Sequence, residues 1–162
     1  TFKIFLQIKS MLFQIIKRIF LIVVFFIFSS CNSNSIDFII INSNVNTFDS
    51  NYSVHSAIAI DNGIFIGIGG EGITKKYQSK NILDAKKMHI YPGLIDFKNS
   101  DPDIQKFKES LFHSGSKTIE VDKVADFVIL DSDIMEIEGK NLSNVKLIAV
   151  FNKGRIVYDI FN

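Results

Sequence analysis

Apolar residues lie in short runs along most of the chain, and Asn, Asp, Ser and Gly separate one run from the next. Runs of about four to eight residues bounded by such turn-forming residues are typical of β-strands. We interpret as strands residues 36–41, 57–60, 64–68, 124–130, 145–151 and 155–158, with 81–91 as a further extended segment and 74–80 as a helical turn or loop. The pattern predicts a mainly β fold, a small sandwich or open barrel.

Two pairs of these runs are joined by short turns that end in Gly. Asn62 and Gly63 stand between the second and third runs, and Asn152-Lys153-Gly154 stands between the last two. Asn before Gly favours a type I′ turn, because both central residues of that turn need a positive φ. The sequence therefore predicts two β-hairpins.

Residues 97–114 differ from the rest because their apolar positions follow a helical period. Asp101 and Pro102 resemble an N-cap followed by proline at the first helical position. The apolar residues that follow, at i, i+3, i+7 and i+8, are Ile104, Phe107, Leu111 and Phe112. Because this spacing places them on one helical face, we expect one short amphipathic helix between the two groups of strands.

The first thirty residues are typical of a targeting segment. Lys17 and Arg18 precede an unbroken apolar run at 19–28, and Ser29-Ser30-Cys31 follows it. This order describes a secretory signal peptide, and the cysteine after two small residues resembles a bacterial lipobox. We expect lipid on Cys31, a polar tether at 32–35 and a start at Met11; the alternative is an uncleaved anchor, although ten apolar residues are short for a span of about 20.

Composition narrows the class of protein further. Hydrophobic residues make up 47% of the chain and 16 residues are Phe, which favours a packed core over disorder. Residues 1–30 carry four basic residues and no acid, so the remainder holds 14 basic and 17 acidic residues. A mildly acidic body without a basic cluster gives no electrostatic footprint for nucleic acid, and we expect no such partner.

The segments at 91–96 (Tyr-Pro-Gly-Leu-Ile-Asp) and 124–130 (Val-Ala-Asp-Phe-Val-Ile-Leu), with their flanks, resemble the two ends of an amidohydrolase. The likeness is to the YtcJ-like, metal-dependent type, amidohydrolase family 3. Residues 119–126 (Ile-Glu-Val-Asp-Lys-Val-Ala-Asp) stand where that family reads I-E-x-G-K-x-A-D, with Asp122 in place of Gly. The resemblance implies a composite β domain made of 36–96 and 115–162.

The resemblance also implies a catalytic (β/α)8 barrel between the two segments, which needs roughly 250 residues. Only the 18 residues 97–114 stand there, so we expect the barrel to be missing. The family's His-x-His metal ligands correspond to Lys98 and Ser100, which are poor zinc ligands. Although the family uses zinc or another divalent metal, we expect no catalytic residue, no metal ligand and no cofactor in this chain.

Other candidate residues carry weaker patterns. His55, His89 and His113 are 34 and 24 residues apart, which matches no local metal spacing. His55 and His89 stand at the edges of expected strands, so we interpret them as surface or hydrogen-bonded histidines. Ser114 and Ser116 beside His113 lack the turn and orienting acid that a nucleophile needs. Residues 67–72 satisfy G-x-G-x-x-G literally, but the following segment is too short and polar for a dinucleotide-binding helix.

Three accounts of function remain open. The chain is an inactive, barrel-less amidohydrolase-like lipoprotein, or a non-catalytic binding or structural module of the envelope, or a partial record of an active enzyme that hydrolyses carbon–nitrogen bonds other than peptide bonds. In each account we expect a membrane-anchored lipoprotein of the bacterial cell envelope, facing the periplasm or the exterior. A small-molecule substrate is not expected, and the sequence identifies no protein partner.

Overall fold

The computed structural model describes residues 11, 14–18, 35–95, 102–113, 117–137 and 139–161. The chain divides into two compact units, Thr1–Ser33 and Asn34–Asn162. In the first unit residues 11 and 14–18 are helical. No helix within the described residues is long and apolar enough to cross a membrane. Cys31 and the expected tether lie outside the described residues.

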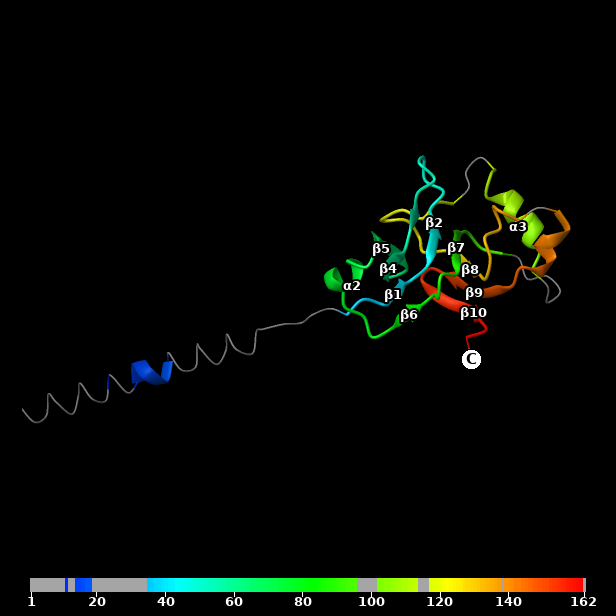
Figure 1. Cartoon of the computed structure of the whole chain (residues 1–162). Coiled ribbons are helices and arrows are strands. Elements are labelled where there is room, and N and C mark those ends of the chain that lie inside the picture. The colour runs from blue at the N-terminus through cyan, green and yellow to red at the C-terminus, as the bar shows by residue number, and fades with distance from the viewer. Residues whose placement is uncertain are drawn as a thin grey trace, which may run out of the picture. The chain divides into compact units, whose positions relative to one another are not determined.

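The second unit is mainly β, as the sequence predicts (Figure 1). Its strands are β1 Phe38–Ile41, β2 Asn44–Asn46, β3 Val54–His55, β4 Ala57–Asp61, β5 Ile64–Gly69, β6 Ile82–Asp84, β7 His89–Pro92, β8 Phe127–Leu130, β9 Leu147–Asn152 and β10 Arg155–Asp159. Its helices are α2 Ile73–Lys76, α3 Ile104–Ser110 and the 3-10 helix η1 Gly139–Asn144. α3 is the short helix expected within residues 97–114, and α2 overlaps the segment 74–80 that we interpreted as a helical turn or loop; η1 was not predicted.

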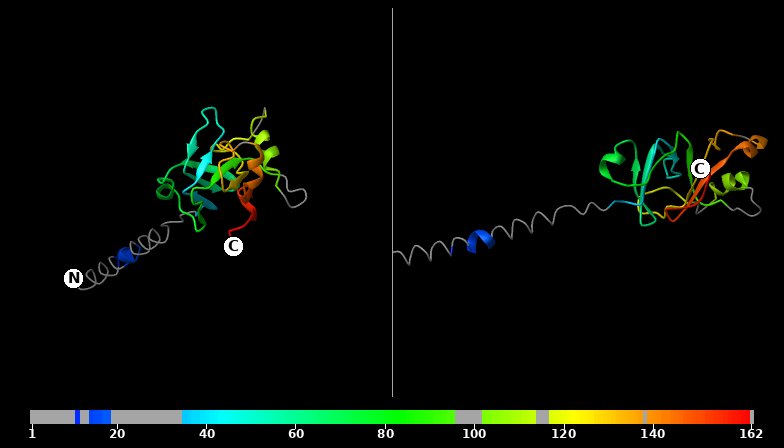
Figure 2. Two further views of the ribbon diagram at one scale, coloured as in Figure 1. Left: turned by 45° about the vertical axis from the view of Figure 1, so that its right-hand side comes forward. Right: turned by 90° about the horizontal axis from the view of Figure 1, so that it is seen from below.

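The strands form two mixed sheets. The smaller sheet has the order β5-β4-β1-β6, and the larger has the order β10-β9-β8-β7-β2-β3. In the larger sheet β7 pairs antiparallel with β8, with His89 opposite Leu130 and Pro92 opposite Phe127. Strands from before and after residues 97–114 thus share one sheet; Figure 2 shows the two sheets from further sides.

Both predicted hairpins are present. β4 pairs with β5 and β9 pairs with β10, each antiparallel. Asn62 and Gly63 have φ of 50° and 79°, and Lys153 and Gly154 have φ of 49° and 71°. The positive φ at both central positions is what a type I′ turn requires. The prediction from the Gly-ended turns is confirmed.

The main core lies between the two sheets. It takes alternate residues of strands in both sheets, such as Ile58 and Ile60 of β4 and Phe127 and Ile129 of β8, and the rings of Phe127 and Phe151 stack with centroids 4.4 Å apart. The intervening residues, such as Tyr91 and Val128, belong to a second cluster on the other face of the larger sheet. The central strands are therefore buried on both faces, because side chains alternate with period two.

The helix α3 covers this second face. Three of the four apolar residues expected on one helical face, Ile104, Phe107 and Leu111, are buried, whereas Phe112, which follows the helix, is 61% exposed. The N-cap is Asp103, whose carboxylate accepts the Lys106 N–H at 2.9 Å, and not Asp101. Asp101 itself lies outside the described residues.

The segment 81–91 is not one extended strand. It is divided into β6 and β7 by a turn in which Lys86 and Lys87 have φ of 48° and 66°. The two strands belong to different sheets: β6 pairs parallel with β1, and β7 pairs parallel with β2. The turn therefore carries the chain from one sheet to the other.

Candidate functional site

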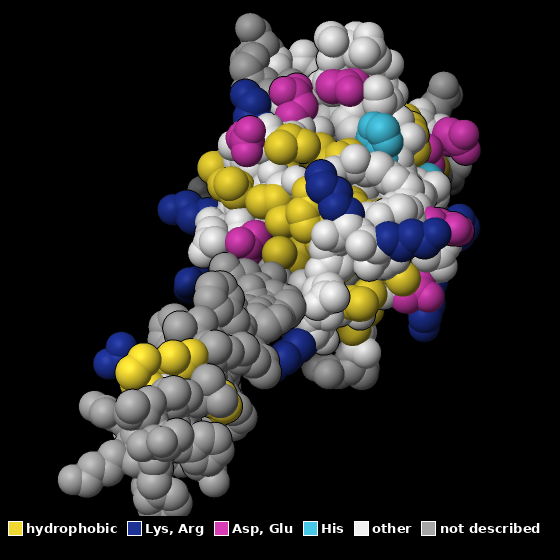
Figure 3. Space-filling view, turned by 90° about the vertical axis from the view of Figure 1, so that its left-hand side faces the viewer, with side chains coloured by type: hydrophobic (Ala, Val, Ile, Leu, Met, Phe, Trp, Pro, Cys, Tyr) yellow, Lys and Arg dark blue, Asp and Glu magenta, His cyan; other side chains and the backbone are white. Residues whose placement is uncertain are grey.

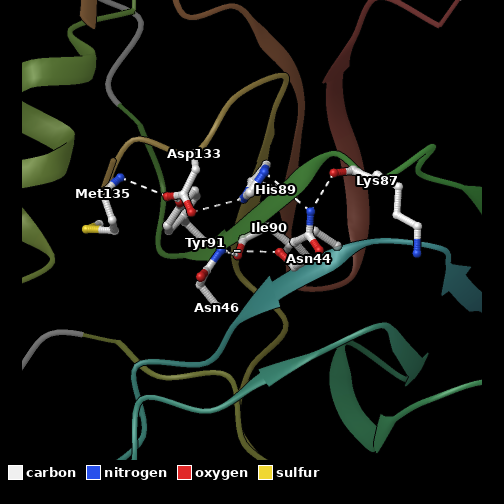
Figure 4. A network of polar contacts seen from close by, with 8 residues as sticks. All are labelled: Asn44, Asn46, Lys87, His89, Ile90, Tyr91, Asp133 and Met135. Carbon is white, nitrogen blue, oxygen red and sulfur yellow. Dashed lines mark hydrogen bonds and ion pairs between the residues drawn. The ribbon is translucent and has the colours of Figure 1, made fainter. Parts of the chain in front are cut away.

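A polar network lies on β7 where it meets β2 and the segment after β8 (Figure 4). His89 and Tyr91 are two residues apart on β7 and so point to the same face, and their rings stack with centroids 6.4 Å apart. The Tyr91 hydroxyl donates to Asp133 Oδ1 at 2.5 Å. The same oxygen accepts the Met135 N–H at 2.9 Å. Asp133 is thus held in place by two donors.

The surroundings of His89 define its tautomer. Asn44 Nδ2 donates to the Lys87 carbonyl at 2.7 Å and lies 3.3 Å from His89 Nε2. Since Asn44 presents a donor, Nε2 is the acceptor and the ring proton of a neutral His89 sits on Nδ1. Nδ1 is buried, has no hydrogen-bond partner among the described residues, and lies 3.7 Å from Asp133 Oδ2. The proton on Nδ1 therefore faces the carboxylate.

The phenol of Tyr91 is held in its neutral form. Burial raises the pKa of Tyr91 above its ordinary value, and the hydrogen bond to Asp133 raises it further. A phenol with a raised pKa is a hydrogen-bond donor and not a base or a nucleophile. Tyr91 therefore serves as a hydrogen-bond donor that orients Asp133.

An aromatic cavity lies next to this network. Its volume is about 150 Å³, and its lining consists of Asn46, Thr47, Phe48, Tyr52, Ser53, Phe112 and Met135. Phe48 makes edge-to-face contacts with Tyr52, Phe112 and Tyr91, at centroid distances of 5.9, 5.9 and 6.2 Å. Phe48 and Tyr52 have φ of 54° and 50°, which bulky residues rarely adopt. We call this the aromatic cavity; it is suited to a small apolar group.

Two larger cavities have more polar walls. One, of about 690 Å³, lies beside both hairpin turns and is lined by Asp37, Lys153 and Arg155 among others. The other, of about 440 Å³, is lined by Ile41, Ala57, Glu71, Lys75 and Lys87 among others. Figure 3 shows apolar side chains flanked by charges of both signs on the α2 side of the molecule. Neither cavity gathers charge of a single sign.

The structure places the three histidines on three separate elements. His55 lies on β3, His89 on β7, and His113 just after α3. His113 is exposed and its Nδ1 lies 2.8 Å from the Glu109 carbonyl, which accepts its proton. In the described part of the chain, no three side chains of His, Cys, Asp or Glu gather as metal ligands. The contact of His89 Nε2 with the Asn44 amide agrees with the interpretation of His89 as a hydrogen-bonded histidine.

Lys98, Ser100, Ser114, Ser116 and Cys31 lie outside the described residues, so the predictions made for them stay predictions. The first glycine of the G-x-G-x-x-G match, Gly67, has a structural role. Gly67 lies in the β4–β5 hairpin, where an added Cβ would be 2.7 Å from the Tyr77 ring. The helix that follows Gly72 is the four-residue α2.

Part of the 119–126 motif stabilises the two hairpin turns. Asp126 Oδ1 accepts the Lys153 N–H at 2.7 Å, and Asp126 Oδ2 accepts a hydrogen bond from Lys117 Nζ. The Ala125 N–H donates to the Gly63 carbonyl at 2.9 Å, and the Ala125 carbonyl accepts the Gly154 N–H at 2.8 Å. The Ala-Asp pair thus joins both turns.

Sequence reasoning missed the Tyr91–Asp133 pair and the aromatic cavity. Tyr91 and Asp133 are 42 residues apart, and the cavity combines residues of the β2–β3 loop with Phe112 and Met135. None of these residues belongs to a local motif. The sequence signal nearest to the cavity is the pair of aromatic residues, Phe48 and Tyr52, among the turn-forming Asn, Asp and Ser of residues 46–53.

No family model matches the chain, and no curated protein matches it. Among solved structures, protein BT9727_2919 of Bacillus thuringiensis is 30% identical, with a TM-score of 0.34 over 38% of this chain and 85% of that one. The N-acyl-D-glutamate deacylase of Bordetella bronchiseptica, solved with zinc and a phosphonate inhibitor, is 19% identical, with a TM-score of 0.32 over 39% and 13%.

An uncharacterised metal-dependent hydrolase of Pyrococcus furiosus is 20% identical, with a TM-score of 0.28 over 36% of this chain and 13% of that one. The chain thus spans 13% of the length of each of these two hydrolases.

Proposed function

We propose that this chain is an amidohydrolase-type composite β domain that does not itself hydrolyse carbon–nitrogen bonds and that lipid on Cys31 holds at the bacterial cell envelope. The observation that carries the proposal is the pairing of β7 with β8. These strands contain Pro92 and Phe127, which belong to the two segments that resemble the ends of an amidohydrolase. The resemblance implies that the two segments belong to one β domain, and the pairing of β7 with β8 supports this.

Inactivity follows from the ligands that metal-dependent hydrolysis needs. A metal lowers the pKa of bound water and polarises the scissile carbonyl, and several ligands must converge on it. The His-x-His positions hold Lys98 and Ser100, and only 18 residues separate Asp96 from Gly115. Such a segment cannot supply the strands of a barrel.

The test is elemental analysis of the purified full chain together with turnover assays on cyclic amides, N-acyl amino acids and formamides. We expect no stoichiometric zinc and no turnover, and the double variant Lys98→His, Ser100→His should not gain activity because further ligands are still missing. One bound metal per chain, with turnover lost on chelation and regained on addition of zinc, would contradict the proposal.

Lipid attachment is tested separately. The order of basic, apolar and small residues before Cys31 supports cleavage after Ser30. The variant Cys31→Ser should lose labelling by a radioactive fatty acid and should no longer fractionate with membranes, whereas Ser33→Ala should behave as the parent chain does. Undiminished labelling of Cys31→Ser would overturn the assignment.

The aromatic cavity favours a second candidate function, a binding module for small apolar groups. Strained backbone conformations, which cost about 1–3 kcal/mol each, concentrate at functional sites. Phe48 and Tyr52, two residues that line the cavity, both have a φ in the left-handed region. Titration with indole, followed by ¹H–¹⁵N NMR, should shift the amides of residues 46–53. Tyr52→Ser should weaken this response and Tyr158→Ser should not; shifts spread evenly over the domain would contradict a specific site.

A further inference from the structure

The outer face of the smaller sheet carries a hydrophobic cluster of its own. Its buried members are Ile39, Ala57, Ala59 and Ile73, and Ile36, Ile41, Ile66 and Tyr77 pack against it. The helix on this face, α2, packs against β4 and β5, but it has only four residues and buries only Ile73. Figure 3 shows apolar side chains with charged ones beside them on this side of the molecule.

The cavity of about 440 Å³ lies on this face and has an apolar part. Ile41 at the end of β1 and Ala57 at the start of β4 line it, and both belong to the cluster of this face. The other lining residues are polar or charged: Asn42, Ser56, Glu71, Thr74, Lys75 and Lys87. Small-molecule pockets have volumes of about 300–1,000 Å³ and combine apolar walls with a few polar groups. The cavity is therefore suited to a ligand with an apolar part and a polar head group.

Two lysines from different elements line the cavity. Lys75 lies on α2, and Lys87 lies on the turn between β6 and β7. Within the described residues, the lysine ammonium groups that make hydrogen bonds belong to Lys108 and Lys117. The ammonium groups of Lys75 and Lys87 therefore remain available to a ligand.

The backbone fixes the position of Lys87. Its N–H donates to the Asn42 carbonyl at 2.6 Å, and its carbonyl accepts the Asn44 Nδ2 group at 2.7 Å. The φ angles of Lys86 and Lys87 are 48° and 66°, in the left-handed region that Gly and Asn adopt more easily. Strained backbone of this kind concentrates at functional sites. The turn thus holds a cationic side chain beside the cavity at a position where Gly would cost less.

Two carboxylates lie close to these lysines. Asp84 Oδ1 accepts the Lys86 N–H and the Asn42 amide, both at 2.8 Å. These two hydrogen bonds, and then the charges of Lys86 and Lys87, lower the pKa of Asp84. Asp84 is thus already engaged, and it is not part of the lining, whereas Glu71 is. Because the lining has two cations and one anion, it favours a ligand with a single negative charge.

We propose that this cavity binds a small amphiphile with one anionic head group, such as a medium-chain fatty acid. The alkyl chain lies against Ile41 and Ala57, and the head group lies within reach of Lys75 and Lys87. The inference does not depend on the proposed function, because none of these residues lines the aromatic cavity or belongs to the segment around Cys31.

Titration with octanoate tests the site. The full chain is held in nanodiscs of phosphatidylcholine, empty nanodiscs measure uptake by the lipid, and the ¹³C-methyl signals of Ile41 and Ala57 are followed. Both signals should shift to saturation. Hexanoate should bind about tenfold more weakly, since it lacks two methylene groups. The neutral alcohol 1-octanol should bind about threefold more weakly, and added salt should weaken the binding of octanoate alone.

Charge variants test the contacts of the head group. Lys75→Gln and Lys87→Gln should each weaken octanoate binding about threefold, and Glu71→Gln should strengthen it about twofold, since exposed charge pairs contribute little individually. Lys106→Gln is the matched control, because Lys106 is an exposed lysine on α3. Thr74→Trp should weaken binding without any change of charge, since Thr74 is exposed and its replacement would fill part of the cavity.

Several results would overturn the proposal. They are methyl signals that do not shift to saturation, equal affinities for octanoate and 1-octanol, and equal effects of Lys75→Gln and Lys106→Gln. Weaker binding by Glu71→Gln would mean that the head group carries a positive charge as well. Shifts of the two methyl signals in nanodiscs of anionic lipid, without any response to octanoate, would assign this face to a membrane surface instead.

Discussion

Asp126 is almost completely buried, with 7% of its surface exposed, yet it is charged. Burial by itself raises the pKa of this carboxyl, but the hydrogen bonds from Lys117 Nζ and the Lys153 N–H outweigh burial and hold the pKa below its usual range. The folded state therefore binds this proton less readily than the unfolded state. The charged Asp126 therefore stabilises the folded state above the unfolded pKa of about 4. This stabilisation is lost as pH falls through the pKa of Asp126 in the folded state.

We expect Asp126→Asn to lower the free energy of unfolding at neutral pH by about 1–3 kcal/mol, because a charged acceptor is removed from a buried site. Below pH about 4, the free energy of unfolding of the variant should also fall less steeply than that of the parent chain. Urea unfolding at several pH values measures both effects, with Glu136→Gln, an exposed acid, as the control. An unchanged acid dependence in Asp126→Asn would contradict this account.

Asp122 occupies a position where the resemblance expects Gly, and its φ of 68° shows why. The left-handed region suits Gly and is tolerated by Asp at some cost. The Asp122 N–H donates to the Phe65 carbonyl at 2.9 Å, so this backbone conformation is fixed by the β5 edge.

We therefore expect Asp122→Gly to raise the free energy of unfolding by up to about 1 kcal/mol and Asp122→Val to lower it by about 1–2 kcal/mol. Asp122→Asn should be close to neutral, because Asn also tolerates a left-handed φ. Thermal unfolding of the three variants ranks them. A Val variant as stable as the Gly variant would show that φ at this position does not matter.

At the scale of elements, the two hairpin turns contact each other and form a joint unit. A Cβ on Gly154 would lie 2.8 Å from Ile60 Cγ2 and 3.1 Å from Gly63 Cα. The positive φ of Gly154 adds a second reason for glycine there. The two turns come from the two halves of the chain, so their contact helps to hold the halves together.

Gly154→Ala should lower the free energy of unfolding by at least about 2 kcal/mol, from strain at positive φ together with the steric overlap. Gly69→Ala is a suitable control, because it lies in β5 and an added Cβ there meets no atom within 4 Å. Chemical denaturation compares the two. Equal losses would mean that the turn contact contributes nothing specific.

At the scale of the whole molecule, the core between the sheets couples the two halves. Phe127 of β8 contacts Phe65 of β5 and Phe151 of β9, with ring centroids 5.8 and 4.4 Å apart. Truncation of Phe127 should therefore loosen both sheets together and not one half alone.

We expect Phe127→Ala to lower the free energy of unfolding by about 3–5 kcal/mol. Hydrogen exchange should accelerate alike for the Ile60 amide in β4 and the Val150 amide in β9. Phe112→Ala, at a ring that is 61% exposed, should cost much less. Faster exchange in only one of the two strands would contradict a shared core.

A simpler measurement addresses the fold class. A chain that begins at Cys31 should give a far-UV circular dichroism spectrum dominated by β structure, because the described residues of 35–161 form ten strands and only short helices. A spectrum dominated by helix would contradict the fold.

The sequence by itself determined the local features of this protein. The turns at Asn62-Gly63 and Lys153-Gly154 are specified by residues that tolerate positive φ, and the strands by short apolar runs, since both depend on neighbouring residues alone. The resemblance of the two motif segments to the ends of an amidohydrolase also led us to expect strands of both halves in one domain. The buried face of α3 followed from its period, apart from Phe112.

Only the tertiary structure decided how distant residues meet. The pairing of Tyr91 with Asp133 and the walls of the aromatic cavity bring together residues from separate elements, and no local pattern encodes such contacts. Packing also decided two further features: residues 81–91 are divided between the two sheets, and Phe112 is exposed. Both depend on which surfaces are covered once the sheets have packed. The physical reason is that turns and periods arise from interactions along the chain, whereas sites arise from packing across it.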